Sequence, residues 1–243
     1  MELLFLDSLS IKIGPSKLVS YVALFAAADV VLGAIPALPM ISWAAFMKPF
    51  EGIALGALGG PLAALLGGFI GMLLFPAAAG LGLYTFTTGA VGALVSGLIV
   101  DRRPLPAALV MLLPLLAFLA SPVGRTVWLP ALYDQIVAVA LLYPSYVLLK
   151  AAEGRSAYLP AAIFLIAFVG TEADNLTGNA LFVDLGLYSS LYGMPASSLY
   201  GMYMAGAFVY PLGRVLVALM NALVGVPVLL ALKRAGLLSW PLT

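Results

Sequence analysis

ISWAAFMKPFEGIALGALGGPLAALLGGFIGMLLF, residues 41–75, is the segment around which this chain is organised. It is apolar throughout, and its only charged residues are Lys48 and Glu51. Gly59-Gly60-Pro61 interrupts it near the middle, and this combination favours a turn because the residue before a proline resists helical geometry. The segment therefore predicts two membrane helices joined by a tight hairpin.

The overall composition is that of a polytopic membrane protein. The 243 residues are 64% hydrophobic and 9% charged, whereas about a quarter of the residues in a soluble domain are charged. Lysine and arginine nearly balance aspartate and glutamate, so net charge gives no signal for nucleic acid. The chain has no cysteine and no histidine, which removes the commonest nucleophile, base and metal ligands. We expect one transmembrane domain over residues 1–243, with no catalytic residue, metal or cofactor.

Eight segments are candidates for crossing a bilayer, which takes about 20 apolar residues in a helix. They are 17–35, 41–58, 61–78, 83–100, 105–120, 127–149, 158–171 and 200–232. The last is too long for one straight span, and Pro211 is expected to separate an outer piece from the membrane helix. Between the last two segments we expect a long polar and aromatic loop, from Glu172 to about Leu199.

Basic residues predict the orientation of these segments. Eight of them flank the first, fourth, sixth and eighth segments: Lys12, Lys17, Arg102, Arg103, Lys150, Arg155, Lys233 and Arg234. With a cytoplasmic N-terminus all eight lie on the cytoplasmic side, as the positive-inside rule requires. The sequence therefore predicts an all-α bundle of about eight transmembrane helices with both termini in the cytoplasm. Six helices are the alternative, if the fifth and sixth segments are re-entrant.

Ionisable residues within the apolar segments are candidates for function, because they are costly in a bilayer. Lys48 and Glu51 are three residues apart, so they share a helix face and are predicted to pair. That pair either has a functional role or holds the second segment in register. Asp29, in the first segment, either pairs with a neighbour or reaches the outer water, and we favour a structural role.

The run TEADNLTGN, residues 171–179, places polar side chains at the outer end of the seventh segment. Glu172, Asp174, Asn175 and Asn179 are residue types that cap helices and form turns. Two carboxylates and two amides are also suitable ligands for a divalent cation, although no second acidic cluster accompanies them.

Arg214 and Asn221 lie seven residues apart on the last segment, so they share a helix face. A buried arginine that faces outward-opening space suits a carboxylate or phosphate. The alternative is an arginine that is paired or that snorkels to the interface.

Aromatic residues gather at the predicted outer ends and in the outer loop: Trp43, Tyr84, Phe86, Tyr188, Tyr192, Tyr200, Tyr203 and Tyr210. An interfacial belt accounts for several of them. A loop as long as 183–203 is usually functional or disordered, and its apolar residues argue against disorder. We therefore expect this loop to form a lid over an outward-facing pocket.

Four stretches together resemble the substrate-capture (S) subunits of energy-coupling factor (ECF) transporters. The first is Ala23-x-x-x-Ala27, a small-residue surface suited to helix docking. The others are GIALGALGGPLAALLGGFIG at 52–71, TFTTGAVGALVSGLI at 85–99 and FVYPLGRVLVALMNALVGVPVLLALK at 208–233. The resemblance covers about residues 1–100 and 157–235.

The resemblance implies a subunit of a prokaryotic plasma membrane importer that captures a vitamin-like solute from outside. Such a subunit works with a membrane T subunit and two cytoplasmic ATPases, so ATP hydrolysis belongs to the partners. Ala23 and Ala27 would contact the T subunit. The solute would bind in the outer half, at Trp43, Tyr84, Thr87, Glu172, Asn175, Arg214 and Asn221, with Tyr203 from the outer loop. Because the family usually has six spans, 105–150 would be an inserted helical hairpin.

Two other functions are compatible with the residues. A stand-alone secondary transporter would couple Lys48, Glu51 or Asp29 to ions. A membrane enzyme acting on a lipid or prenyl substrate would use Glu172 and Asp174 with a metal. The chain contains no GxxxxGK[ST] phosphate-binding loop, which agrees with a capture subunit that relies on partners for energy.

Overall fold

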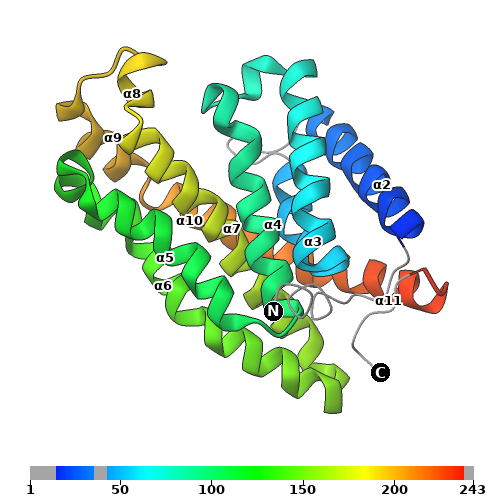
Figure 1. Cartoon of the computed structure of the whole chain (residues 1–243). Helices are drawn as coiled ribbons and strands as arrows, with labels where there is room; N and C mark the ends of the chain where they lie inside the picture. The colour runs from blue at the N-terminus through cyan, green and yellow to red at the C-terminus, as the bar shows by residue number, and fades with distance from the viewer. Residues whose placement is uncertain (1–14, 36–42, 238–243) are drawn as a thin grey trace, which may run out of the picture.

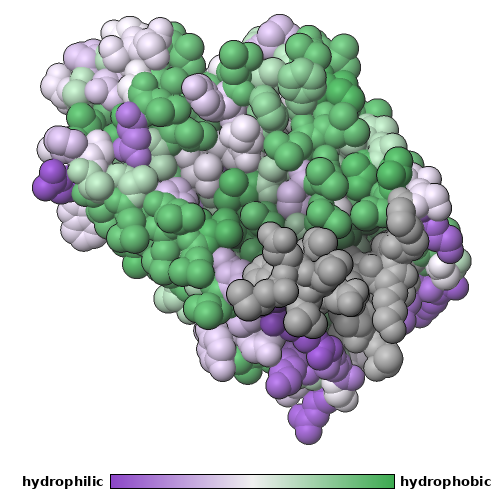
Figure 2. All heavy atoms as spheres, in the orientation of Figure 1, coloured by the Kyte–Doolittle hydropathy of each residue, from purple (hydrophilic) through white to green (hydrophobic). Residues whose placement is uncertain are grey.

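The computed structural model describes residues 15–35 and 43–237, and every regular element in these ranges is helical. Six of the described helices are long and apolar enough to cross a membrane. They are Ser16–Ala34, Trp43–Leu74, Gly82–Val100, Pro122–Gly154, Ser156–Asp184 and Val209–Arg234. Figure 2 shows apolar residues covering the flanks of the bundle and hydrophilic residues at its lower end. The chain is an all-α multi-pass membrane protein, as predicted.

The first described helix is α2 (Pro15–Ala34). The next, α3 (Trp43–Leu74), contains most of the segment 41–75 and reverses direction at Gly56. Gly56 has φ 72° and ψ −172°, a backbone conformation that is essentially restricted to glycine. A Cβ at Gly60 would lie 2.5 Å from the Cα of Gly52, although residues eight apart in a straight helix are about 12 Å apart. Thus α3 is a hairpin of two helical arms, residues 43–55 and 57–74 (Figure 1).

The predicted hairpin is present, but its predicted turn at Gly59-Gly60-Pro61 is wrong. These residues lie in the second arm, where glycine allows the backbones of the two arms to approach closely. The residue directly after α4 (Thr85–Val100) completes the turn. This residue, Asp101, accepts a hydrogen bond of 2.9 Å from the N–H of Ala57. Burial raises the pKa of Asp101, and this hydrogen bond and Arg103 oppose the rise.

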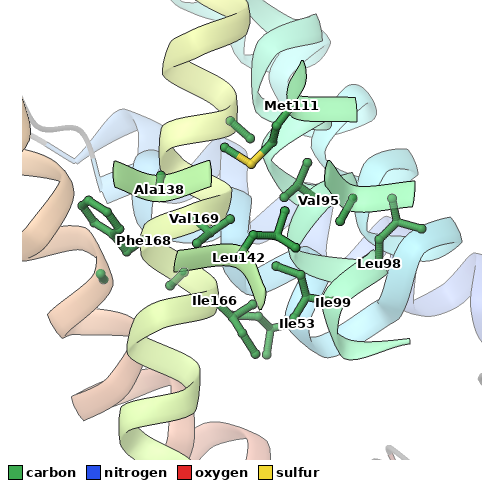
Figure 3. Close-up of a cluster of buried hydrophobic side chains, with 14 of the residues drawn as sticks. Ile53, Val95, Leu98, Ile99, Met111, Ala138, Leu142, Ile166, Phe168 and Val169 are labelled. Atoms are coloured by element: carbon green, nitrogen blue, oxygen red, sulfur yellow. The ribbon is translucent and has the colours of Figure 1, made fainter. Parts of the chain in front are cut away.

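The middle of the bundle is built around α4 and α7 (Leu159–Asp184), which pack against each other. On one side α4 packs against both arms of α3, and on the other α7 packs against α5 (Pro104–Ala120) and α6 (Pro122–Gly154). Two short 3-10 turns, Pro76–Ala78 and Gly82–Tyr84, join α3 to α4. Figure 3 shows buried apolar side chains from all five helices meeting at the centre, among them Ile53, Val95, Met111, Leu142 and Ile166.

The structure contains a helical hairpin at the position expected for 105–150. Its helices α5 and α6 cover 104–120 and 122–154, so the second is longer than the predicted segment 127–149. That this hairpin is an insertion remains a prediction.

The predicted loop from Glu172 to Leu199 is wrong in its first part, because α7 continues to Asp184. The run TEADNLTGN is therefore helical. Glu172, Asn175 and Asn179 are spaced by three and four residues, so they share one face of α7. Polar residues are compatible with a membrane helix when they face a cavity or a neighbouring helix instead of lipid.

The C-terminal part begins with short helical pieces, α8 (Leu187–Ser190), a 3-10 turn at Ala196–Ser198 and α9 (Leu199–Gly206). A break at Ala207 and Phe208 separates α9 from α10 (Val209–Met220), so the predicted division lies slightly before Pro211. A π-helical turn, Asn221–Gly225, leads into α11 (Val226–Arg234). The Tyr21 hydroxyl donates a hydrogen bond to the carbonyl of Leu237, which places the start of α2 beside the end of α11.

Candidate functional site

A cavity of about 300 Å³, called the main cavity below because charged and amide side chains line it, lies between α6, α7, α9 and α10. Its walls combine aromatic rings with carboxylates, amides and one arginine. The rings belong to Tyr133, Phe182, Tyr203 and Tyr210; the polar groups belong to Asp134, Asp174, Gln135, Asn175, Asn179 and Arg214. A concave space with apolar walls and a few fixed polar groups is the usual form of a small-molecule site.

Asn179 connects three walls of the main cavity. Its Nδ2 donates to the carbonyl of Ala131 on α6 at 3.0 Å, and its Oδ1 accepts from the hydroxyl of Tyr203 on α9 at 3.4 Å. Burial raises the pKa of Tyr203, so this hydroxyl keeps its proton and remains a donor. These bonds fix α9 against α6 and α7, and they hold the Tyr203 ring at the cavity.

Asp134 and Arg214 both line the main cavity, yet they are not paired. Among the described residues no ion pair within 4.0 Å involves Arg214, and its Nε is buried without a hydrogen-bond partner. The guanidinium lies 6.0 Å from the centre of the Tyr210 ring. Asp134 is 7% exposed, and its Oδ1 accepts from the N–H of Gln135 at 3.0 Å. Opposite charges are thus available separately to a bound molecule.

Glu172 is fully buried and interacts electrostatically with Asp134 and Arg214, although it does not line the main cavity. Its Oε2 accepts a hydrogen bond of 3.4 Å from Asn175, which does line the cavity. Its Oε1 has no hydrogen-bond partner within the described part of the chain. Glu172 therefore influences the charge balance of the site from behind its wall.

A second cavity of about 240 Å³ lies between α2, α3 and α4. Lys48 and Asp29 form an ion pair there, so the predicted pairing of Lys48 with Glu51 is wrong. The partner on α2 is within reach because the helices approach closely at Gly67, where a Cβ would lie 2.6 Å from Oδ2 of Asp29. Glu51 is fully buried, and neither of its carboxylate oxygens has a hydrogen-bond partner among the described residues.

The two cavities are neighbours. Thr88 of α4 and Asp174 of α7 line both of them. A polar wall therefore separates the Asp29–Lys48 pair from the main cavity.

The structure brings together part of the predicted site. Asn175, Tyr203 and Arg214 meet on the main cavity, and Glu172 lies directly behind it. The others line neither cavity: Trp43, Tyr84, Thr87 and Asn221.

These four residues have other surroundings. Trp43 and Tyr84 are 37% and 43% exposed, and the Thr87 hydroxyl donates to the carbonyl of Tyr84 at 2.7 Å. Asn221 is fully buried, and its Nδ2 donates to the carbonyl of Phe46 at 3.2 Å, which links the π-helical turn to α3. Asn221 thus contributes to helix packing.

Sequence reasoning missed the wall that α6 supplies, formed by Tyr133, Asp134 and Gln135. These residues fall inside the predicted inserted hairpin, 105–150, for which the sequence predicts no site residue. The signal was present, because an aspartate and a glutamine side by side in an apolar segment meet the same criterion that selected Lys48.

Ala23 and Ala27 lie on the exposed side of α2, whereas Ala26 between them is buried. The predicted lid region, 183–203, consists largely of α8, the turn at Ala196–Ser198 and the start of α9. It is tied down by Tyr192, whose hydroxyl donates to the carbonyl of Gly80 at 2.5 Å.

No family model matches the chain, and no curated protein or solved structure is significantly similar to it. The two cavities and the residues around them are therefore the features that bear on function.

Proposed function

We propose that this chain is the solute-capture subunit of an ECF-type importer in a prokaryotic plasma membrane. It would bind a small vitamin-like solute in the main cavity and deliver it together with a membrane T subunit and two ATPases. The observation that carries the proposal is the main cavity itself, where tyrosines, amides and Arg214 are enclosed within an apolar bundle. Such an arrangement favours reversible binding of a small, ring-containing solute.

We further propose eight membrane crossings with both termini in the cytoplasm. The two arms of α3 would cross separately, and the 17-residue helix α5 would add another crossing. Basic residues at the start of α2, after α4, at the α6–α7 connection and at the end of α11 support this orientation. They are Lys17, Arg102, Arg103, Lys150, Arg155, Lys233 and Arg234, while Lys12 lies outside the described residues.

Thermal-shift screening of the purified protein against vitamins and their precursors tests solute capture. We expect at least one compound to stabilise the protein with submicromolar affinity, and Arg214→Ala to weaken that affinity. The matched control is Arg125→Ala, which removes an exposed arginine on α6 that does not line the cavity. The absence of any stabilising compound, or equal affinity in Arg214→Ala and wild type, would count against the cavity as the binding site.

The exposed alanines on α2 suggest where the T subunit would dock. Ala23→Trp or Ala27→Trp is expected to block co-purification with a T subunit and to leave solute binding unchanged, because neither alanine lines the cavity. Leu113→Trp, at a 70% exposed position on α5, is the control for a bulky residue on the lipid-facing surface. Co-purification of the alanine variants at wild-type levels would refute this docking site.

The second candidate function is a stand-alone secondary transporter. The observation that favours it is the Asp29–Lys48 ion pair in the second cavity. Thr88 and Asp174 line both this cavity and the main cavity. Ion coupling commonly uses such intramembrane charges. Solute uptake into liposomes containing this chain alone, without ATP, would favour the transporter; uptake only with the T subunit and ATPases would favour the capture subunit.

A further inference from the structure

Buried polar atoms that lack a hydrogen-bond partner are mostly acceptors in the described part of the chain. Six are carboxylate or amide oxygens, and only the Nε of Arg214 is an N–H donor. The oxygens are Asp29 Oδ1, Glu51 Oε1 and Oε2, Gln135 Oε1, Glu172 Oε1 and Asn221 Oδ1, and the Ser96 hydroxyl can act either way. An unpartnered buried acceptor that lines a cavity is stabilised when a bound molecule donates a hydrogen bond to it.

Charge shows the same imbalance. The lining of the main cavity carries two carboxylates, those of Asp134 and Asp174, but only one cationic side chain, that of Arg214. Lys48 is engaged by Asp29, so Arg214 is the one cationic side chain on the main cavity. An excess of carboxylates over cationic side chains on the wall of a cavity favours the entry of added positive charge.

One of these unpartnered acceptors lies on the α6 wall of the main cavity. Gln135 is 1% exposed, lines the cavity and has an unpartnered Oε1. The Asp134 carboxylate lies next to it and accepts hydrogen bonds from the backbone N–H groups of Gln135 and of Asp134 itself. The rings of Tyr133 and Tyr203 line the same space, and the faces of aromatic rings attract cations.

We infer that the main cavity selects an organic cation that carries N–H donors, with Asp134 and Gln135 as the groups that receive it. The protonated nitrogen of a small aromatic amine or amidine would supply both the missing donors and the missing positive charge. The guanidinium of Arg214 then binds hydrogen-bond acceptors at the other end of the solute, or it balances the negative charge of Glu172. This inference deepens the proposed capture function and rests on it.

Three probes of nearly equal shape test the inference: benzamidine, which is cationic at neutral pH, benzamide, which is neutral, and benzoate, which is anionic. We expect benzamidine to raise the melting temperature of the purified full-length chain and the other two to leave it unchanged. Stabilisation by benzamide or benzoate equal to that by benzamidine would overturn the cation preference. Failure of all three would also overturn it, whereas the proposed function fails only if the vitamin screen gives no ligand either.

A matched pair of variants tests whether the cation binds in the main cavity. Asp134→Asn keeps the shape of the side chain and removes its charge, so benzamidine affinity should fall roughly tenfold to a hundredfold, the usual range for losing one charged hydrogen-bond partner. Asp184→Asn, the same change at an exposed aspartate outside the cavity, should bind as wild type does. Equal affinity in the two variants would overturn the role of Asp134. Should Asp134→Asn fail to fold, Gln135→Leu at the same wall replaces it, with loss of benzamidine binding expected.

Discussion

Gly56 is the residue at which α3 reverses, and replacing it with alanine tests the hairpin directly. Its φ of 72° and ψ of −172° lie in a region that side chains with a Cβ essentially do not occupy. Forcing alanine into that conformation costs on the order of 1–3 kcal/mol. For a chain of this size, each kcal/mol lowers the melting temperature by about 2–4 °C.

We therefore expect Gly56→Ala to lower the melting temperature by roughly 2–12 °C. The turn has little freedom to relax, because Gly97 of α4 packs against it: a Cβ at Gly97 would lie 2.5 Å from the carbonyl carbon of Gly56. The assay is differential scanning fluorimetry of the detergent-solubilised protein, with size-exclusion chromatography as a check that the variant remains monodisperse.

Gly71→Ala provides the matched control on the same helix. Gly71 lies in the second arm, and a Cβ there would meet no atom within 4 Å. Alanine favours a helix over glycine by up to about 1 kcal/mol, so this variant should be as stable as wild type or slightly more stable. If Gly56→Ala melts at the wild-type temperature, or if both variants shift equally, the glycine-dependent turn is refuted.

Two further predictions concern the hairpin cap and the topology. Asp101→Ala removes the acceptor for the N–H of Ala57 and should destabilise the protein by about 0.5–2 kcal/mol, as loss of a helix cap usually does; an unchanged melting temperature would contradict this. Because the chain contains no cysteine, single-cysteine variants can be labelled without background. In intact cells a membrane-impermeant maleimide should label Thr126→Cys and Ser197→Cys, whereas Ser156→Cys should react only after permeabilisation. Labelling of Ser156→Cys in intact cells, or protection of Thr126→Cys, would contradict eight crossings.

Part of the site could be predicted from single positions in the sequence. A buried arginine suits an anionic group, which predicts Arg214 as a site residue, and the family resemblance implies Asn175; both line the main cavity. Asn221 is predicted because it shares a helix face with Arg214 and because the resemblance implies it, yet it bonds to a backbone carbonyl of α3. The cost of burial identifies a residue that needs a partner, but it does not say whether that partner is a ligand or another helix.

The sequence alone determined the membrane class, the all-helical fold and the presence of a helical hairpin within residues 41–75. These properties depend on the number and spacing of apolar residues along the chain, which are local quantities. The structure alone decided that Gly56 makes the turn while Gly59 and Gly60 serve packing, since a glycine in a turn and a glycine at a close contact look the same in sequence. It also decided that Lys48 pairs with Asp29 and that Asp134 joins Arg214 at one cavity. Both arrangements bring together side chains from different helices, and only the packing of those helices brings them close.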